Sequence, residues 1–361
     1  LADDMGLGKT FQLLTLMAWI LEKNPLSAPM LIVAPVSLLE NWKEEADKFY
    51  PGAFKILTAY GDALKPLRLS REEIDTRLKS EDGLVKFLRP GWVGSANVVL
   101  TTYETLRDLE FSFANVYWSL MVCDEAQKIK NPAAMVTRAA WRQNVGFRIS
   151  CTGTPVENTL VDLWSLFEFC QPGLLGALND FGKLYRRPIE IDERDEEGKQ
   201  RLDELRSLIE PQMLRRTKQE VARDLPKKII VDECRHLKIS SSQRSFYAKA
   251  LDDFKRRDEP GFPAPFKNHL GLLQYIRIVC TDPRRYGLSV FKPEPLENYR
   301  KSSPKLDWLL KQLSVIKDKN EKAIIFCEFR NVQCLLQHYI KEVFEIQADI
   351  INGDTSASST H

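Results

Sequence analysis

The chain has 361 residues, of which 43% are hydrophobic and 28% are charged, and its net charge is +2. This length suits about two globular domains, and so small a net charge does not by itself indicate a nucleic-acid partner. The seven cysteines form no C-x-x-C pair, which argues against a zinc site or a disulfide framework. The sequence also has no run of about 18 apolar residues, the length needed for a membrane-spanning helix.

The first ten residues, LADDMGLGKT, are typical of a phosphate-binding loop. The stretch Gly6-Leu7-Gly8 allows the backbone to curl so that successive N–H groups face phosphate oxygens. We expect Lys9 to contact the β- and γ-phosphates and the Thr10 hydroxyl to hold Mg²⁺. Asp3 occupies the position of the first glycine in the strict pattern, so for this stretch alone an ordinary glycine-rich turn is the alternative.

Short apolar runs alternate with helical patterns over the first 170 residues. Strands are expected at 30–34, 54–60, 97–102, 118–123 and 147–151, and helices at 11–23, 37–49, 133–143 and 160–169. Ser37 is the expected cap of the second of these helices. Uninterrupted apolar runs are typical of strands buried on both faces of a parallel sheet. The pattern therefore predicts an α/β fold with helices on both faces of the sheet.

The sequence changes character near Arg186 and stays charge-dense and mainly helical to Lys228. The patterns beyond predict two further helices and then a second α/β unit. The helices are expected at 240–257 and 267–280, and the unit comprises helices at 306–316 and 332–343 and strands at 322–327 and 346–351. An exposed helix is also possible at 71–86.

Two groups of polar residues follow neighbouring apolar strands. Asp124-Glu125 ends the run at 118–123, and Thr152-Gly153-Thr154 ends the run at 147–151. The carboxyl ends of parallel strands lie on the ligand side of the sheet, so both groups should lie near the phosphate loop. We expect Asp124 to hold Mg²⁺ and Glu125 to orient or deprotonate the attacking water. The hydroxyls of Thr152 and Thr154 would sense the phosphate; taken singly, the two groups are also compatible with solvated acids and a turn.

These stretches together resemble the Swi/Snf-type ATPases, the double-stranded-DNA translocases of helicase superfamily two. The matching stretches occur in the order of the family's motifs across nearly the whole chain. They are LADDMGLGKT, APVSLLENW at 34–42, LTTYETL at 100–106, VCDEAQKIKN at 122–131, TGTPVENTLVDLWSLFEF at 152–169, LRRTKQEVARDLPKK at 214–228, KAIIFCEF at 322–329 and INGDT at 351–355. Asp at position 3 belongs to the family's variant of the loop. Where the family often has Gly-His or Ala-His after the acidic pair, this chain has Ala126-Gln127.

The resemblance implies a fold and an activity. The fold is a RecA-like ATP-binding lobe at 1–175, a helical insertion at 176–300 and the start of a second RecA-like lobe at 301–361. The activity is an ATP-dependent translocase or remodeller motor on double-stranded DNA, with ATP and Mg²⁺ as cofactors, Gln127 near the nucleotide and a DNA-bound protein as a remodelling target. A strand-separating helicase, a restriction-type motor and a non-catalytic ATP- or partner-binding module are the alternatives.

The resemblance also points to residues that would contact DNA. Motif Ia and the LTTYETL region imply backbone contacts from Ser37, Thr101 and Thr102, with Lys43 as a further candidate. Arg215 and Arg216 belong to the densest basic cluster of the sequence. That cluster would lie along DNA phosphates or would form a solvated face or a strut between lobes.

Relative to the family, we expect the chain to lack the strand before the phosphate loop, the upstream adenine-reading motif, and motifs V and VI with the arginine finger. Without that finger, which contributes on the order of 10³–10⁵ in rate, the 361-residue chain is expected to hydrolyse ATP negligibly. Without the preceding strand, the phosphate loop is expected to be poorly held. The expected location is the cytoplasm or nucleoid, or the nucleus in a eukaryote.

Overall fold

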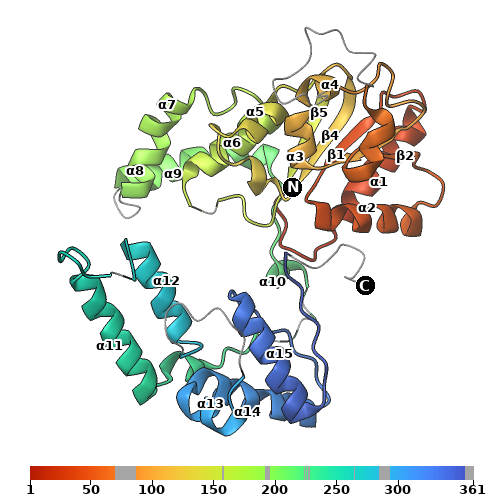
Figure 1. Cartoon of the computed structure of the whole chain (residues 1–361). Coiled ribbons are helices and arrows are strands. Elements are labelled where there is room, and N and C mark those ends of the chain that lie inside the picture. Colours follow the sequence, from red (N-terminus) through yellow and green to blue (C-terminus); the bar gives the residue numbers. More distant parts are fainter. Residues whose placement is uncertain are drawn as a thin grey trace. The chain divides into compact units, whose positions relative to one another are not determined.

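A computed structural model describes residues 1–69, 87–156, 158–191, 196–222, 224, 226, 228–263, 265–283 and 293–353. The chain divides into two compact units, Leu1–Leu225 and Pro226–His361, and each is described by itself (Figure 1). The division into three parts at 175/176 and 300/301 stays a prediction. The possible helix at 71–86 lies entirely outside the described residues, so it too is untested.

The first unit is built on a five-stranded, entirely parallel sheet with strand order β2-β3-β1-β4-β5. The strands are β1 Met30–Val33, β2 Ile56–Thr58, β3 Val98–Thr101, β4 Trp118–Asp124 and β5 Val145–Cys151. All five predicted strands of this region are therefore confirmed. β1 lies between β3 and β4, with Ile32 in register with Leu100 on one side and Val122 on the other.

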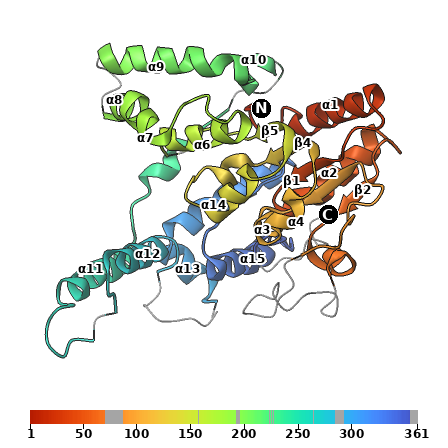
Figure 2. The ribbon, with the colours of Figure 1, turned by 90° about the horizontal axis from the view of Figure 1, so that it is seen from above.

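The sheet is covered on both faces because successive side chains of its strands are apolar and point to opposite sides. Leu31 of β1 belongs to a core with helices α3 (Tyr103–Asp108) and α4 (Glu110–Ala114). Ile32 belongs to a second core with helices α1 (Lys9–Lys23) and α2 (Val36–Phe49). Both side chains are almost fully buried, and each such burial contributes about 1.5–3 kcal/mol. Figure 2 shows α1 on one side of the strands and α3 and α4 on the other.

The first unit also contains helices and short helical turns between and after the strands. They are α1 Lys9–Lys23, α2 Val36–Phe49, η1 Gly61–Leu67, α3 Tyr103–Asp108, α4 Glu110–Ala114, η3 Ala126–Ile129, α5 Met135–Trp141, α6 Leu160–Cys170, α7 Leu178–Phe181, η4 Gly182–Arg186, α8 Arg187–Ile191, α9 Glu196–Ile209, η5 Glu210–Gln212 and α10 Lys218–Val221. The four predicted helices at 11–23, 37–49, 133–143 and 160–169 correspond to α1, α2, α5 and α6. Ser37 lies inside the first turn of α2 and does not cap it, because the residue before the helix is Pro35.

Helix α6 joins the sheet to the helices that follow it. Leu166 and Phe169 pack into the core on the sheet, whereas Trp164 and Phe167 pack against α7–α9. A helix that is apolar on nearly all sides is buried on nearly all sides. Helices α7–α9 are thus packed onto the first unit through α6.

Helices are the regular secondary structure found among the described residues of the second unit. Its elements are η6 Asp232–His236, α11 Ser241–Lys255, α12 His269–Val279, α13 Leu296–Ser302, α14 Pro304–Asp318 and α15 Arg330–Phe344. One apolar cluster joins α11 to α12 and another joins α13 to α15. Among the described residues, no helix is both long enough and apolar enough to cross a membrane.

The two strands predicted in the second unit are wrong. The segments 322–327 and 346–351 form no strand in the described residues. A strand requires a paired neighbouring strand, and among those residues neither segment belongs to a sheet. Ile324 and Phe326, the apolar residues that suggested a buried strand, are 83% and 94% exposed.

Phe113 and Phe111 of α4 provide a matched test of this core. Phe113 is fully buried against Trp92 and Trp118, and Phe111 is 66% exposed. Phe113→Ala should lower the free energy of unfolding by about 3–5 kcal/mol because it leaves a cavity. Phe111→Ala should change it by no more than about 0.5 kcal/mol. Urea unfolding followed by tryptophan fluorescence reports mainly on this unit, which holds six of the seven tryptophans. Equal losses in the two variants would contradict the described core.

Candidate functional site

The site lies at the edge of the sheet where three neighbouring segments end. β4 ends at Asp124, and β5 is followed by Thr152. Leu1 lies beside β5, since its amino group donates to the Ser150 carbonyl at 2.7 Å and the Thr152 N–H donates to the Leu1 carbonyl at 3.1 Å. The loop that follows Leu1 therefore leaves the same edge as Asp124 and Thr152. The expectation of a poorly held loop is wrong, because the first residues pair with β5.

The phosphate-type loop has the backbone shape that its glycines permit. Gly6 and Gly8 have φ angles of 80° and 71°, in the left-handed region that favours glycine. Gly8 immediately precedes α1, which begins at Lys9. The N–H groups at the start of a helix lack helical acceptors and attract anions. Thr10, in this first turn, is half-buried.

The side chain of Lys9 contacts the loop itself. Its Nζ donates to the Asp3 carbonyl at 2.8 Å and to the Asp4 carbonyl at 3.2 Å. These contacts use neutral carbonyl oxygens, whereas an ammonium group binds charged acceptors more strongly. Lys9 is thus held at the loop by bonds that an anion could replace.

Asp124 is held rigidly at the end of β4. Its Oδ2 accepts from Trp42 Nε1 at 3.0 Å, its Oδ1 accepts from the Glu125 N–H at 3.0 Å, and its carbonyl accepts from the Tyr103 hydroxyl at 2.7 Å. Burial raises the pKa of the Asp124 carboxyl, and the hydrogen bond from Trp42 opposes that rise. Sequence reasoning placed Trp42 in the core, which its 1% exposure confirms, but missed its contact with Asp124 because no pattern links the two positions.

Glu125 starts a chain of hydrogen bonds that reaches the loop after β5. Glu125 has a φ of 50°, an uncommon conformation for a residue with a side chain. Its Oε2 accepts from Gln127 Nε2 at 2.6 Å, and Gln127 Oε1 accepts from the Thr152 hydroxyl at 2.9 Å. The same hydroxyl accepts from the Thr154 N–H at 3.1 Å. The acidic pair and the Thr152–Thr154 loop are therefore directly connected.

Gly153 brings the loop after β5 against the phosphate-type loop. A Cβ placed on Gly153 would lie 3.1 Å from Met5 Cγ, closer than side chains normally approach. The absence of a side chain at Gly153 thus permits close contact between the two loops. All three predicted groups of site residues meet at one edge of the sheet.

A divalent cation at this edge would need ligands from more than protein side chains. Among the described residues, no three His, Cys, Asp or Glu side chains form a metal-binding group. Mg²⁺ is commonly held by one or two protein oxygens together with water and phosphate oxygens. The Asp124 carboxylate and the Thr10 hydroxyl are of this type, so the residues fit Mg²⁺ bound together with a phosphate compound.

The structure does not bring the candidate DNA-contacting residues together at one edge, as it does the predicted nucleotide-site residues. Thr101 is fully buried and its hydroxyl donates to the Ala59 carbonyl at 2.8 Å, which argues against contact through this side chain. Thr102 is 4% exposed and caps α3 by accepting from the Thr105 N–H at 3.0 Å. Ser37 is exposed. The Lys43 ammonium is bonded to Glu40 at 2.8 Å.

The two candidate arginines differ from each other. Arg215 is exposed, whereas the guanidinium of Arg216 is bonded to the buried carboxylate of Asp3. Sequence reasoning offered DNA or a strut as partners of this basic cluster and missed the phosphate-type loop. Asp3 and Arg216 are 213 positions apart, and no sequence pattern pairs them.

Comparison with known proteins agrees with this geometry. Residues 1–284 match the SNF2-related domain family. The chain is 52% identical over 364 residues to Zorya protein ZorD of Escherichia coli O139:H28, covering 99% of this chain and 33% of that protein. It is 33% identical over 359 residues to the putative ATP-dependent helicase/translocase YwqA of Bacillus subtilis, covering 99% and 36%. The chain thus spans about a third of the length of these relatives.

A solved structure shows the same fold. The Sulfolobus solfataricus SWI2/SNF2 ATPase core in complex with dsDNA aligns with a TM-score of 0.51 and 27% identity, covering 99% of this chain and 68% of that chain. The phosphate-type loop, the acidic pair and the loop after β5 all lie within the part of the chain that matches the family. The chain therefore belongs to the SNF2-related family, the Swi/Snf-type ATPases of helicase superfamily two.

Proposed function

We propose that this chain is the motor core of a protein that hydrolyses ATP to ADP and phosphate in order to move along double-stranded DNA. The observation that carries the proposal is the meeting of the phosphate-type loop, Asp124-Glu125 and Thr152–Thr154 at one edge of the sheet. ATP hydrolysis needs a phosphate cradle, a cation ligand and a group that positions water. Each of these roles has a residue of the right chemistry at this edge.

The loop and the start of α1 would hold the phosphates of ATP. The backbone around Gly6-Leu7-Gly8 supplies N–H donors, and Lys9 can exchange its carbonyl acceptors for phosphate oxygens. Thr10 and Asp124 would hold Mg²⁺, which neutralises phosphate charge when it is bound. The rigid attachment of Asp124 to Trp42 and Tyr103 keeps its carboxylate in place for this role.

Glu125 is the proposed base that orients or deprotonates the attacking water. Its Oε2 is fixed by Gln127, and the carboxylate retains lone pairs that can accept a proton from water. Gln127 donates a hydrogen bond to Glu125. We therefore propose that Gln127 lies near the nucleotide, beside the base. An Asn or Gln side chain keeps this bridge neutral over the whole pH range, in contrast to a histidine.

The hydrogen bonds from Glu125 through Gln127 to Thr152 and Thr154 would couple hydrolysis to movement. Loss of the terminal phosphate would change the contacts of the loop after β5, and that loop is bonded to the group that holds the base. Small rearrangements at a phosphate site drive larger movements in many nucleotide-dependent switches.

Contact with duplex DNA is supported by the family and by the Sulfolobus solfataricus core, whose structure contains dsDNA. Ser37, Lys43, Thr102 and Arg215 remain the proposed contacts from this chain, through side chains or backbone groups that position the duplex without reading its sequence. A DNA-bound protein as the target and a location with DNA, in the cytoplasm, nucleoid or nucleus, belong to the same proposal.

Lys9→Ala should weaken binding of a fluorescent ATP analogue by about tenfold to a hundredfold. Loss of a charge-assisted hydrogen bond costs about 1.5–3 kcal/mol, and each 1.4 kcal/mol is tenfold in affinity. Lys23→Ala is the matched control, because it removes the same charge from the exposed end of α1. Equal affinities for both variants and the unchanged chain would contradict ATP binding at this loop.

Trp42→Phe should shift the pH dependence of Mg²⁺-dependent ATP binding. The change removes the hydrogen bond that lowers the pKa of Asp124, so this pKa should rise further. Only the carboxylate form binds the cation, and binding should therefore be lost at a higher pH on acidification. The measurement is the affinity for the ATP analogue over a pH series with and without Mg²⁺. Trp19→Phe, at a 55% exposed position of α1, should leave the profile unchanged; a shift equal to that of Trp42→Phe would count against this role for Asp124.

Glu125→Gln in the complete gene product should bind ATP but lose hydrolysis that duplex DNA stimulates. The amide keeps the shape of the side chain but cannot accept the proton from water, and a positioned base typically contributes about 10²–10⁴ in rate. Steady-state phosphate release with and without duplex DNA measures the effect. Retained stimulation would show that another group is the base.

With its sequence unchanged, the complete gene product should displace the third strand of a DNA triplex, and it should not separate the strands of a duplex. Strand separation would favour a helicase, and ATP binding without either activity would favour a binding module.

A further inference from the structure

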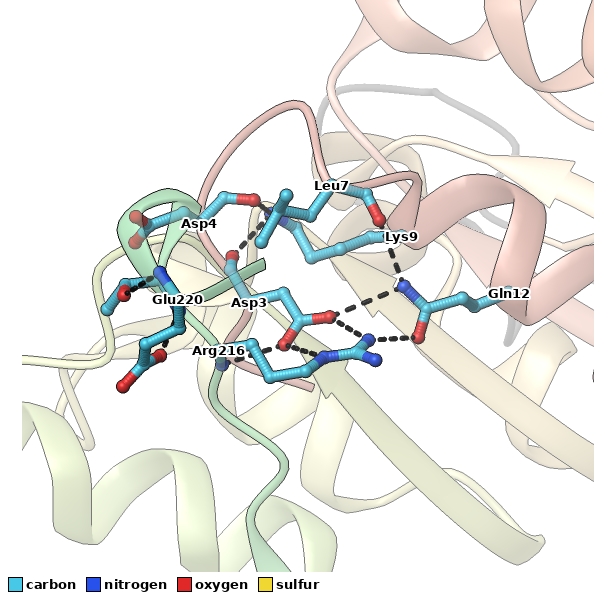
Figure 3. A network of polar contacts seen from close by, with 8 residues as sticks. Asp3, Asp4, Leu7, Lys9, Gln12, Arg216 and Glu220 are labelled. Atoms are coloured by element: carbon cyan, nitrogen blue, oxygen red, sulfur yellow. Dashed lines mark hydrogen bonds and ion pairs between the residues drawn. The ribbon is translucent and has the colours of Figure 1, made fainter. Parts of the chain in front are cut away.

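Asp3, the residue that stands where a strict phosphate loop has glycine, is fully buried and bonded to Arg216 (Figure 3). Asp3 Oδ1 accepts from the Arg216 backbone N–H at 2.9 Å and from its Nε at 3.2 Å. Asp3 Oδ2 accepts from Arg216 Nη2. Two side-chain donors and one backbone donor of a single residue thus surround one carboxylate.

The backbone on both sides of Arg216 is attached to the same loop. The Ala2 N–H donates to the Leu214 carbonyl at 2.7 Å, and the Asp4 N–H donates to the Arg216 carbonyl at 3.0 Å. The Lys218 N–H donates to Asp4 Oδ2 at 2.9 Å. We call residues 214–218 the clamp segment, because they run beside residues 2–4 and bond to each of them in turn.

The clamp segment reaches the side chain that would bind phosphate. The carbonyls of Asp3 and Asp4 accept from Lys9 Nζ, and the clamp segment fixes the side chains or N–H groups of these same two residues. Figure 3 shows Lys9 on one side of Asp3 and Arg216 on the other. The position of the Lys9 ammonium therefore depends on Arg216 through one intervening residue.

Gln12 of α1 closes the network. Its Oε1 accepts from Arg216 Nη2 at 2.9 Å, and its Nε2 donates to Asp3 Oδ2 at 3.3 Å and to the Leu7 carbonyl at 3.1 Å. The network consequently reaches two points of the loop, Asp3 before the glycines and Leu7 between them.

Burial makes this carboxylate depend on its partner. Hydrogen bonds from the Arg216 side chain hold the pKa of Asp3 below its usual value. The Arg216 side chain is 41% exposed, so as an ion pair it adds little to overall stability. Removing the arginine, however, leaves a buried carboxylate without its cation, which proteins tolerate poorly.

We infer that Arg216 is a positioning residue for the phosphate-binding loop, and that through Asp3 it sets where Lys9 awaits the phosphates of a nucleotide. The inference rests on the proposed binding of ATP at this loop. It gives Asp3 a function that glycine could not perform, since glycine has no carboxylate for Arg216 to hold.

Arg216→Ala tests the inference against Arg187→Ala, which removes the same charge from an exposed residue of α8. Hydrogen exchange of the 361-residue chain without nucleotide measures the loop directly. The N–H groups of Ala2 and Asp4 should exchange at least about tenfold faster in Arg216→Ala than in the unchanged chain, and no faster in Arg187→Ala. Unchanged exchange in Arg216→Ala would overturn the inference whether or not the chain binds ATP.

Affinity for a fluorescent ATP analogue is the second measurement. Arg216→Ala should lose about tenfold or more, Arg216→Lys should lose less because it keeps the charge without the planar fork, and Arg187→Ala should stay within about twofold. Ethylguanidinium should restore binding to Arg216→Ala by filling the vacated, half-exposed site, and it should not restore binding to Lys9→Ala. A merely structural defect elsewhere would not respond to this compound.

The two proposals fail in different ways. If Lys9→Ala binds the ATP analogue as well as the unchanged chain, ATP binding at the loop is wrong, while faster exchange in Arg216→Ala would still support the attachment of the loop to Arg216. If Lys9→Ala loses binding but Arg216→Ala binds as the unchanged chain does, the positioning role of Arg216 is wrong and ATP binding at the loop stands.

Discussion

The parallel sheet of the first unit leaves one place for polar chemistry, the edge where the carboxyl ends of its strands emerge. Both faces of the sheet are covered with apolar side chains from strands and helices, and a polar group buried there without partners would cost several kcal/mol. The loops after Leu1, β4 and β5 all leave at that edge. Their proximity is therefore a consequence of strand direction and burial, and the site needs no further element to bring them together.

Two buried carboxylates at this edge have opposite electrostatic surroundings. Asp3 faces a guanidinium, and its pKa is lowered mainly by hydrogen bonds from Arg216. Asp124 faces the neutral N–H groups of Trp42 and Glu125, and its pKa is raised by burial. The charge of Asp3 is thus balanced within the protein, while that of Asp124 is left for a ligand to balance. This difference separates a carboxylate that holds a loop from one suited to hold a cation.

The sequence predicted the parts of this unit that follow from local patterns. Each strand is a short, mainly apolar run, and in β5 the apolar residues alternate with Arg148 and Ser150. All five were therefore predictable, and the polar residues at their ends could be assigned to one edge. Helices α3 and α4 were not predicted, because six and five residues are too few to show a helical period. The strands at 322–327 and 346–351 were predicted wrongly, since an apolar run does not reveal whether a neighbouring strand exists. The contacts of Asp124 with Trp42 and of Asp3 with Arg216 join residues 82 and 213 positions apart, and only the folded chain brings them together.

The distance along the chain between Asp3 and Arg216 has a consequence for how the protein is made. A ribosome adds about 5–20 residues per second, so the Asp3 side chain emerges roughly ten to forty seconds before the arginine that neutralises it. During that interval the nascent sheet can form, but the loop ahead of α1 has no clamp segment to order it. If ATP binds at this loop as proposed, its affinity would therefore rise once the chain has been synthesised past residue 218, late in the synthesis of the first unit.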